Sequence, residues 1–488
     1  IKADGGLAIL TAKGANDAMR GVVNNSGTIE AAALQNRNGR VLLLGDMEHG
    51  EVNADGTLSA SFVETSAARV NIADDVAVRT NGGTWLIDPN DFTIAASGGN
   101  MTGATLSNNL ANGNVTITTA SQGTAGGNGD IFVNDGITWS ANKLTLNADR
   151  NININTEMYG SGTAGLALEY AQTDAGGDYF VNAPVNLAST GSFSTKGASA
   201  PTIDYTIITS LGTQSSLGDG TLQGIAGNLL GNFVLGGNID ARSTQSWNNG
   251  LGFDPIGEFT STPNGNGGTS TVTRPFVGNF DGLGHSINGL HIDRPTQTSV
   301  GLFAVASSGA TGAPQGGNIR NVGLLSVLVT GNENVGALIG SASGFKVRNV
   351  FSEGLIKADS RVGGLIGSSS AEVSFSYSKA RIETLNGRAG GLIGANSGTI
   401  ARSYATGDVR GDVTRASRLG GLVGDNRGLI ENSFATGNVS GQQVVGGLVG
   451  IADGTIRKTF ATGSVSGDTD VGGLIGLWAV LRMARRWR

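Results

Sequence analysis

The strongest constraint on this chain is a short phrase that recurs in its second half at nearly constant spacing. The phrase has the form hydrophobic–Gly–small–Leu–hydrophobic–Gly, and its copies begin at Val335, Val362, Ala389, Leu419, Val445 and Val471. The first glycines of successive copies are 27, 27, 30, 26 and 26 residues apart. Self-similarity at a fixed period of this length predicts a stack of structural repeats rather than one globular core.

Each repeat contains two further phrases that resemble short strands. An aromatic residue flanked by small residues follows the glycine phrase, and a short apolar segment such as the one at Val409 closes the repeat. Glycine, asparagine, serine and aspartate, which favour turns, separate the three segments. No segment offers the 10 to 15 residues of 3.6-residue periodicity that a helical repeat needs, and the period is too short for a propeller blade of about 40 residues.

These observations predict an all-β fold, specifically a right-handed parallel β-helix with three short strands per coil. Coils stacked at the ~4.8 Å strand spacing would place equivalent residues above one another. We therefore expect two interior ladders of side chains. The first consists of Leu338, Leu365, Leu392, Leu422, Leu448 and Leu474, and the second of Phe351, Tyr377, Tyr404, Phe434 and Phe460.

The composition is compatible with this fold and excludes several classes of function. Glycine contributes 81 of the 488 residues, yet 39% of the residues are hydrophobic, so a core can be buried. The net charge of −6 argues against a nucleic-acid-binding protein, which would need a basic surface. The absence of cysteine excludes thiolate metal ligands and cysteine nucleophiles. No apolar run approaches the roughly 18 residues of a membrane-spanning helix, so we expect no stable membrane insertion.

The recurring phrases resemble the GLUG motif, which is named for its Gly–Leu–hydrophobic–Gly core. The resemblance covers about residues 299 to 476, and the preceding segment from Phe280 to Ile292 is similar to the coil that often introduces such repeats. GLUG repeats occur in bacterial surface and secreted proteins, including some with an immunoglobulin-cleaving protease domain. The resemblance therefore implies a secreted or surface location.

The first 200 residues follow a looser pattern of short strands, with roughly 20 residues per coil. The segment from Gly83 to Ile94, with Trp85, Asp88 and Asp91 in the pattern W-x-I-D-P-x-D, resembles large exoproteins of the filamentous-haemagglutinin type. This resemblance implies secretion from a Gram-negative bacterium through an outer-membrane transporter, the two-partner route. The signal peptide and secretion domain of that family are not visible, so we expect an interior segment of a longer exoprotein.

The sequence suggests four regions. Residues 1–200 form the filamentous-haemagglutinin-like region, residues 201–270 a junction within one continuous solenoid with a loop at Asn264–Gly268, and residues 271–476 the GLUG repeats. Residues 477–488 form a cationic tail without the repeat pattern. This tail has three interpretations: a segment that touches a membrane surface, a cap on the last coil, or an out-of-frame end.

The sequence offers few candidates for catalysis. None of the histidines (His49, His285 and His291) belongs to an H-E-x-x-H pair, so no metal site is predicted. Asp240, Asp254, Asp281 and Asp293 could serve a polysaccharide-cleaving β-helix enzyme, which uses clustered or paired carboxylates. All four lie among turn signals, however, and the simpler interpretation is solvated turn residues. We predict no cofactor, no metal and no enzymatic activity.

One tripeptide is a candidate for receptor binding. Arg410, Gly411 and Asp412 form the sequence that integrins recognise. The interval from Val409 to Leu419 is ten residues, whereas the equivalent intervals in the next two repeats are six. Four extra residues beside the tripeptide predict a longer loop that projects outward. Gly467 and Asp468 occupy the equivalent place in a later repeat, which favours ordinary turn chemistry instead.

The sequence thus predicts a non-catalytic segment of a bacterial secreted or cell-surface adhesin, acting as a stiff stalk or presenting surface. Its receptor or glycan is not identified by any residue pattern beyond the tripeptide. Two alternatives remain open. One is a carbohydrate-active enzyme on the same scaffold, and the other is a non-catalytic region of a secreted protease.

Overall fold

The computed structural model describes residues 2–3, 7–12, 22–31, 39–120, 127–173, 176–263, 269–308 and 317–479. The chain forms two compact units, Ile1–Ile207 (unit 1) and Ile208–Arg488 (unit 2). The boundary therefore falls inside the region expected to be a junction. The expected loop at 264–268, and the expected tail from residue 480 onward, lie outside the described residues.

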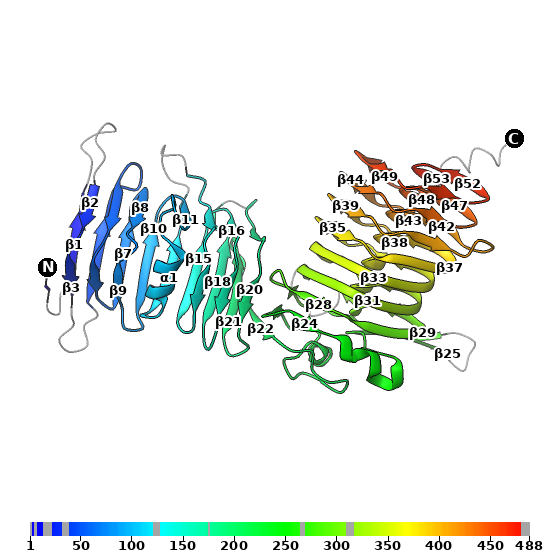
Figure 1. Cartoon of the computed structure of the whole chain (residues 1–488), viewed down its shortest axis with the longest axis horizontal. Coiled ribbons are helices and arrows are strands. Elements are labelled where there is room, and N and C mark those ends of the chain that lie inside the picture. Colours follow the sequence, from blue (N-terminus) through cyan, green and yellow to red (C-terminus); the bar gives the residue numbers. More distant parts are fainter. Residues whose placement is uncertain are drawn as a thin grey trace. The chain divides into compact units, whose positions relative to one another are not determined.

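Both units consist almost entirely of parallel strands stacked coil upon coil, so the predicted all-β, solenoid-type fold is observed (Figure 1). Handedness stays a prediction that rests on the right-handed preference of parallel crossovers.

In unit 1 each coil contributes strands to three parallel stacks. The first stack contains β1 (Leu7–Thr11), β4 (Arg40–Leu44), β7 (Phe62–Ser66), β10 (Thr84–Asp88), β12 (Asn114–Thr118), β15 (Lys143–Asn147), β18 (Gly165–Tyr170) and β21 (Ser192–Gly197). The second consists of two separate sheets. One contains β2 (Val22–Asn25), β5 (Glu51–Ala54) and β8 (Arg69–Ile72), and the other contains β11 (Phe92–Ile94), β13 (Ile131–Val133), β16 (Ile152–Ile154) and β19 (Tyr179–Val181). The third contains β3 (Thr28–Glu30), β6 (Thr57–Ser59), β9 (Ala77–Arg79), β14 (Ile137–Trp139), β17 (Met158–Gly160) and β20 (Val185–Leu187). The prediction of three strands per coil is therefore met by most coils of this unit, and the coil that begins with β10 is an exception.

A helix, α1 (Gly103–Leu110), lies between β9 and β14 in the place of a third-stack strand. The sequence analysis did not predict it. Thr102 caps its first turn by accepting a hydrogen bond from the Thr105 backbone N–H, and Leu106 and Leu110 are buried. Eight residues are too few for the helical period to stand out, so the packing of the two leucines decides the helix.

Buried and more exposed side chains alternate along the strands of unit 1, and the buried ones form its core. In β10 the side chains of Trp85 and Ile87 are buried while their neighbours are partly exposed. The parallel register places equivalent residues in one buried ladder, which consists of Val41, Val63, Trp85, Val115, Leu144, Leu166 and Phe193. The unit ends with β22 (Ile203–Ile208), which pairs with β21 in the antiparallel sense.

Unit 2 begins with irregular coils. They contain η1 (Gln223–Gly227), β23 (Phe233–Leu235), β24 (Ile239–Asp240), η2 (Arg242–Gly250), the antiparallel hairpin of β25 (Glu258–Pro263) and β26 (Thr269–Arg274), β27 (Phe280–Asp281), β28 (Ser286–Asn288), β29 (His291–Val300) and β30 (Phe303–Ser307). β23 and β24 pair in parallel with β27 and β28, so regular stacking begins before the GLUG-like phrases.

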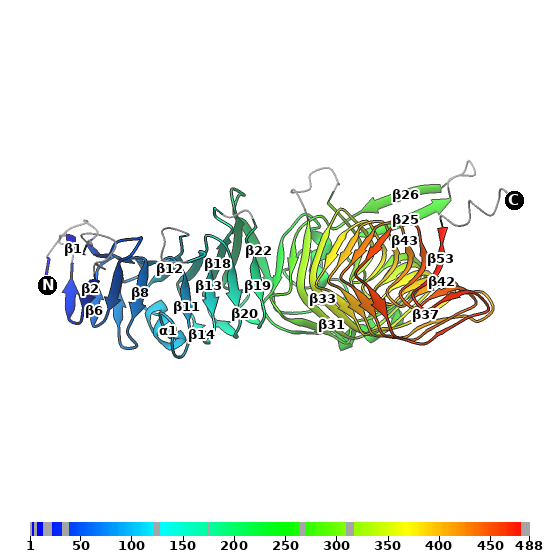
Figure 2. The same cartoon turned by 90° about the horizontal axis from the view of Figure 1, so that it is seen from above.

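The repeat coils follow. They contain β31 (Asn318–Gly336), β32 (Ile339–Ser343), β33 (Lys346–Gly363), β34 (Ile366–Ser369), β35 (Glu372–Ser374), β36 (Tyr377–Ser378), β37 (Arg381–Gly390), β38 (Ile393–Asn396), β39 (Thr399–Ala401), β40 (Tyr404–Ala405), β41 (Val409–Gly411), β42 (Ser417–Gly420), β43 (Val423–Asn426), β44 (Leu429–Glu431), β45 (Phe434–Ala435), β46 (Val439–Ser440), β47 (Gln443–Gly446), β48 (Val449–Ala452), β49 (Thr455–Arg457), β50 (Phe460–Ala461), β51 (Val465–Ser466), β52 (Thr469–Gly472) and β53 (Ile475–Trp478). Figure 2 shows the same stack from above.

The register confirms the predicted period. Val335 pairs with Val362, Val362 with Ala389, Ala389 with Leu419, Leu419 with Val445 and Val445 with Val471. Three strands per coil is wrong for this unit, because the later coils break into more and shorter pieces, such as β44, β45, β46, β47 and β48. Turn residues interrupt even the short apolar phrases, so a strand can shrink to two residues.

The leucine ladder is interior as predicted: Leu338, Leu365, Leu392, Leu422 and Leu448 are fully buried. Leu474, in the last repeat coil, is 38% exposed. Leu477 and Trp478, assigned to the tail from the sequence, belong to β53 and pair with Ile451 and Ala452.

The prediction that the aromatic ladder is interior was wrong. Its rings are stacked at centroid distances of 4.7 to 5.1 Å and within 6° of parallel, but they lie on the outside of the coil. The following residues, among them Ser378, Ala405 and Ala435, point into the core instead. Since neighbours on a strand face opposite sides, only one of each pair can be buried, and the small residue fits the narrow interior.

Candidate functional site

The Arg410–Gly411–Asp412 tripeptide lies at a strand end rather than on a projecting loop. Arg410 and Gly411 belong to β41, where they pair with Glu383 and Thr384 of β37. The Asp412 backbone N–H donates to the Thr384 carbonyl oxygen. The inserted residues form a turn after the tripeptide, and in this turn Val413 is 68% exposed. The extra length therefore projects Val413 outward, while the tripeptide itself stays joined to the preceding coil.

Charged groups of the tripeptide are engaged within their own coil. Arg410 forms an ion pair with Asp408 at 3.0 Å. The Asp412 carboxylate accepts hydrogen bonds from the backbone N–H and the hydroxyl of Thr414. These hydrogen bonds lower the pKa of the Asp412 carboxyl, with a smaller contribution from nearby Arg415. Asp412 is thus a turn-forming residue in addition to any role in recognition.

A groove of 540 Å³ crosses several coils of unit 2 at this position. Its lining includes Thr330 of β31, Lys357 of β33, Glu383 of β37 and Arg410 of β41, together with Asp359 and Asp412. Lys357 and Glu383 form an ion pair at 3.1 Å. The groove therefore presents a nearly balanced row of charges along the stacking direction, with Leu385 as an exposed apolar side chain among them.

The three histidines do not form a metal site. Within the described ranges, no group of three or more His, Asp or Glu side chains could hold a metal ion. His285 is buried just before β28, whereas His291 begins β29 and is partly exposed. His49 belongs to unit 1, where its backbone N–H donates to the Asp46 carboxylate.

Two of the four aspartates considered for catalysis form ion pairs with arginine. Asp240 pairs with Arg242 at 2.6 Å, and hydrogen bonds from this arginine lower the pKa of Asp240 to about 2. Asp254 pairs with Arg294 at 3.0 Å. Asp254 also lines a cavity of 450 Å³ together with Glu258 and Arg274.

The other two aspartates have structural surroundings. Asp281 is buried, and its carboxylate accepts hydrogen bonds from the Leu283 backbone N–H and the Asn321 amide. Asp293 is a partly exposed residue of β29. Asp281 is therefore a buried strand residue and not the solvated turn residue that the sequence suggested, while Asp254 lies in a cavity with a second carboxylate.

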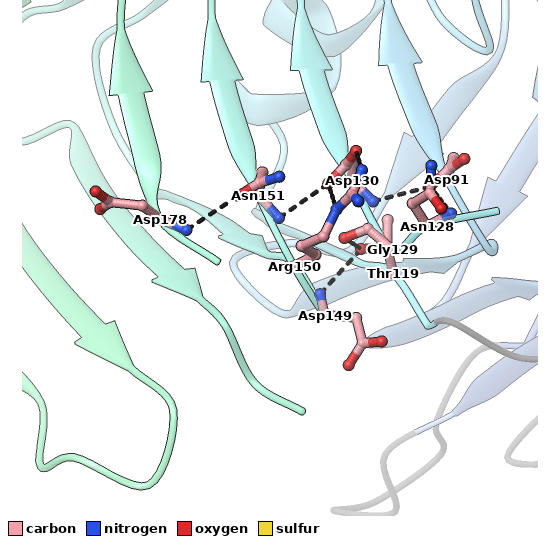
Figure 3. Close-up of polar contacts among 9 residues, drawn as sticks. All are labelled: Asp91, Thr119, Asn128, Gly129, Asp130, Asp149, Arg150, Asn151 and Asp178. Atoms are coloured by element: carbon pink, nitrogen blue, oxygen red, sulfur yellow. Dashed lines mark hydrogen bonds and ion pairs between the residues drawn. The ribbon is translucent and has the colours of Figure 1, made fainter. Parts of the chain in front are cut away.

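A polar ladder at one corner of unit 1 was missed from the sequence (Figure 3). A polar residue lies directly before each of four second-stack strands: Asp91 before β11, Asp130 before β13, Asn151 before β16 and Asp178 before β19. The Asp91 carboxylate accepts a hydrogen bond from the Asp130 backbone N–H at 2.8 Å. In the same way the Asp130 carboxylate accepts from the Asn151 backbone N–H at 3.0 Å, and the Asn151 amide oxygen accepts from the Asp178 backbone N–H at 3.0 Å. The side chains of Asp91, Asp130 and Asn151 thus each satisfy a backbone N–H of the next coil.

Arg150 strengthens this ladder at its centre. Its guanidinium donates Nε and Nη2 to the two carboxylate oxygens of Asp130, whose side chain is only 7% exposed. Such a two-pronged, charge-assisted contact fixes geometry as well as charge. An Asp or Asn placed before an apolar–x–apolar triplet was the available sequence signal, but its meaning depends on knowing the register. The ladder is a structural device rather than a ligand site.

No protein-family model matches the chain. One curated protein, halomucin from Haloquadratum walsbyi, is 38% identical over 198 residues, which is 41% of this chain and 2% of that protein. A crystal structure of a candidate immunoglobulin A1 protease from Bacteroides ovatus covers 50% of this chain and 75% of its own, with 19% identity and a TM-score of 0.35. That likeness is too weak to support an argument about function. No helix among the described residues is long and apolar enough to cross a membrane.

Proposed function

We propose that this chain is a non-catalytic segment of a bacterial secreted or cell-surface adhesin, built as a stack of coils that presents binding surfaces. The groove across β31, β33, β37 and β41 is the observation that carries this proposal, because it combines an open cleft, a row of charges and the Arg410–Asp412 tripeptide. A stacked array suits presentation because each coil contacts only its neighbours, so length can grow without redesign of the core. The similarity to a short stretch of a far longer protein is compatible with a segment role.

The test is adhesion of beads coated with the whole chain to host epithelial cells and to bacterial cells. Arg410→Gln combined with Asp412→Asn removes both charges, and the asparagine retains an oxygen that can accept from Thr414. The matched control is Arg457→Gln with Glu431→Gln, which removes an ion pair of 2.6 Å outside the groove. We expect the groove variant to lose most of its adhesion and the control to retain it. Equal adhesion of both variants would disprove the role of the groove, and uncoated-bead levels for the unmodified chain would disprove the adhesin.

For export we propose the two-partner route suggested by the resemblance of residues 1–200 to filamentous-haemagglutinin-type exoproteins, from a Gram-negative cell. The outer-membrane transporter would then be the partner during secretion. Expression of the chain's gene with and without a gene for an outer-membrane transporter of this type tests the route, by the amount of protein in the medium. Equal secretion in both strains would contradict the route.

A carbohydrate-active enzyme is the second candidate, favoured by the 450 Å³ cavity that Asp254 and Glu258 line together. Two carboxylates near one cavity are the minimum that glycoside hydrolysis needs. The test is release of reducing ends from a panel of polysaccharides by the whole chain, with Glu258→Gln as the variant. Product that disappears in this variant would favour the enzyme over the non-catalytic segment.

A further inference from the structure

Four arginines gather in unit 2 at a second cleft, whose lining shares no residue with that of the 540 Å³ groove. Arg361, Arg388 and Arg418 directly precede the Val362, Ala389 and Leu419 positions, which pair in register, so they occupy the same place in three successive coils. Arg427 follows the last residue of β43. Figure 1 shows β38 and β43, the strands next to this cluster, side by side in the stack.

The backbone at this position does not explain the choice of arginine. The φ angles of Arg361, Arg388 and Arg418 are +50°, +54° and +64°, in the left-handed region that favours glycine or asparagine. The preceding coil has Asn334 at the equivalent position, with φ of +56°. Like charges stacked at the ~4.8 Å coil spacing also repel one another. Arginine in three successive coils at this position is therefore unfavourable both for the left-handed backbone conformation and because the like charges repel.

The carboxylates nearby compensate only part of this charge. Asp425 is buried, with a side chain 8% exposed, and lies 3.7 Å from the guanidinium nitrogens of Arg388, Arg418 and Arg427 alike. This distance is longer than a hydrogen bond. Arg361 pairs with Glu333 at 2.8 Å.

Four guanidinium groups thus share two carboxylates, in a protein whose net charge is −6. Burial lowers the pKa of Arg388, and repulsion from Arg361 and Arg418 lowers it further. Positive charge is therefore in excess at this cluster, and the carboxylates of the described residues neutralise only part of it.

Three of these arginines line a cleft of 260 Å³ that is rich in hydrogen-bond donors. The lining includes Arg361, Arg388, Arg427 and Asp425, with the hydroxyls of Ser368 and Ser397. Guanidinium forks match the oxygens of sulfate, phosphate and carboxylate groups. Among the described residues, no aromatic side chain lines this cleft, whereas single-stranded nucleic-acid sites combine positive charge with aromatic stacking. The lining therefore favours an oxyanion over a nucleic acid.

We propose that this cleft binds a tetrahedral oxyanion, either free sulfate or phosphate or the sulfate ester of a polysaccharide. The anion would lie between Arg388 and Arg427, where it supplies the negative charge that Asp425 supplies only in part. Stacking of the arginines along the coils would let a polymer place successive esters on successive guanidinium groups. This proposal is independent of the groove at the Arg410–Asp412 tripeptide.

The test is calorimetric titration of the whole chain with sodium sulfate, sodium phosphate, dextran sulfate and neutral dextran at constant ionic strength. The cleft variant is Arg388→Gln with Arg427→Gln. The control is Arg381→Gln with Arg457→Gln, which removes the same charge from two ion-paired arginines outside the cleft. We expect the cleft variant to bind about tenfold or more weakly, and the control to stay within about twofold of the unmodified chain. Equal affinity of the two variants would overturn the proposal.

A second variant keeps the test informative if the double variant unfolds. Asp425→Asn removes the competing carboxylate with little change of shape, so it should tighten anion binding, whereas Glu353→Gln on an exposed strand position should not. Binding of sulfate or phosphate alone identifies a small-ion site, and binding of dextran sulfate only identifies the polymer as the source. Binding of single-stranded DNA as tight as that of dextran sulfate, or no binding of any anion, would overturn the proposal.

Discussion

Both units hold successive coils together with side-chain acceptors, and unit 2 adds a glycine that recurs in every repeat phrase. In unit 1 the corners are held by side chains, because Asp91, Asp130 and Asn151 accept hydrogen bonds from the backbone of the next coil. In unit 2 Asp408 and Asn438 accept hydrogen bonds from the backbone of the next coil in the same way. The recurring glycine of each phrase adds a close approach of backbones. A Cβ built on Gly421 would lie 2.2 Å from the Gly447 carbonyl oxygen of the next coil. The recurring glycines of unit 2 accompany a period of 26 to 30 residues, whereas unit 1 contains a helix among its coils.

The largest expected effect tests the glycine corner. Gly421→Ala should destabilise unit 2 by about 3 kcal/mol, because the added methyl group overlaps a backbone atom that cannot move alone. Hydrogen exchange measured by mass spectrometry should show faster exchange in unit 2 peptides and unchanged exchange in unit 1.

Gly473→Ala is the matched control, since Gly473 has the same place in the last phrase and a Cβ there meets nothing within 4 Å. Similar exchange in the two variants would show that close approach does not hold these corners.

The side-chain corner is tested by Asp130→Ala. This change removes the acceptor for the Asn151 backbone N–H and the partner of Arg150, and we expect a loss of about 2 kcal/mol, confined to unit 1. Urea unfolding combined with exchange in each unit measures it. Asp130→Asn retains an oxygen acceptor for Asn151 and should cost about half as much. An alanine variant as stable as the unmodified chain would mean that packing alone aligns the coils of unit 1.

The outer aromatic ladder distinguishes unit 2 further. Tyr404 stacks on Tyr377 at 4.7 Å and on Phe434 at 4.8 Å, so Tyr404→Ala should cost about 1 to 2 kcal/mol. Near-ultraviolet circular dichroism should also lose the signal of coupled rings. Tyr404→Phe keeps the stacking and is the control. Equal stability of the alanine and phenylalanine variants would show that the stacked rings do not contribute to stability.

The smallest effect concerns a carboxyl group of unit 1 and depends on pH. Burial, with repulsion from Glu64, raises the pKa of Asp88 from 3.8 to about 6. Since the folded-state pKa lies above the unfolded one, stability is highest below about pH 4 and falls as the pH rises towards 6. Asp88→Asn should therefore stabilise unit 1 at pH 7, by about 1 kcal/mol after allowance for solvent screening, and should change little at pH 4.

Thermal unfolding at both pH values measures this difference. Asp75→Asn, at an exposed turn of the same unit, serves as the control and should give no pH-dependent change. A stabilisation that is equal at pH 4 and pH 7 would contradict the ionisation of Asp88 as its cause.

Much of the fold was predictable because the spacing of a sequence repeat indicates which residues of neighbouring coils pair. The spacing of the glycine phrases predicted which residues would pair, and Leu365 and Leu392 are buried in one ladder as expected. A hydrophobic period is a local property, so the sequence by itself determined parallel stacking, the coil length and the interior leucines.

Only the tertiary structure decided which way the aromatic residues face, because both members of a pair such as Tyr404 and Ala405 satisfy the same pattern. It also decided that Asp130 meets Arg150 and that Asp425 lies among three arginines, since these residues converge from different coils and corners. Such contacts depend on the angle at each turn and on the backbone conformation at positions such as Arg388. Those angles are set by packing over the whole coil, which no local pattern of residues records.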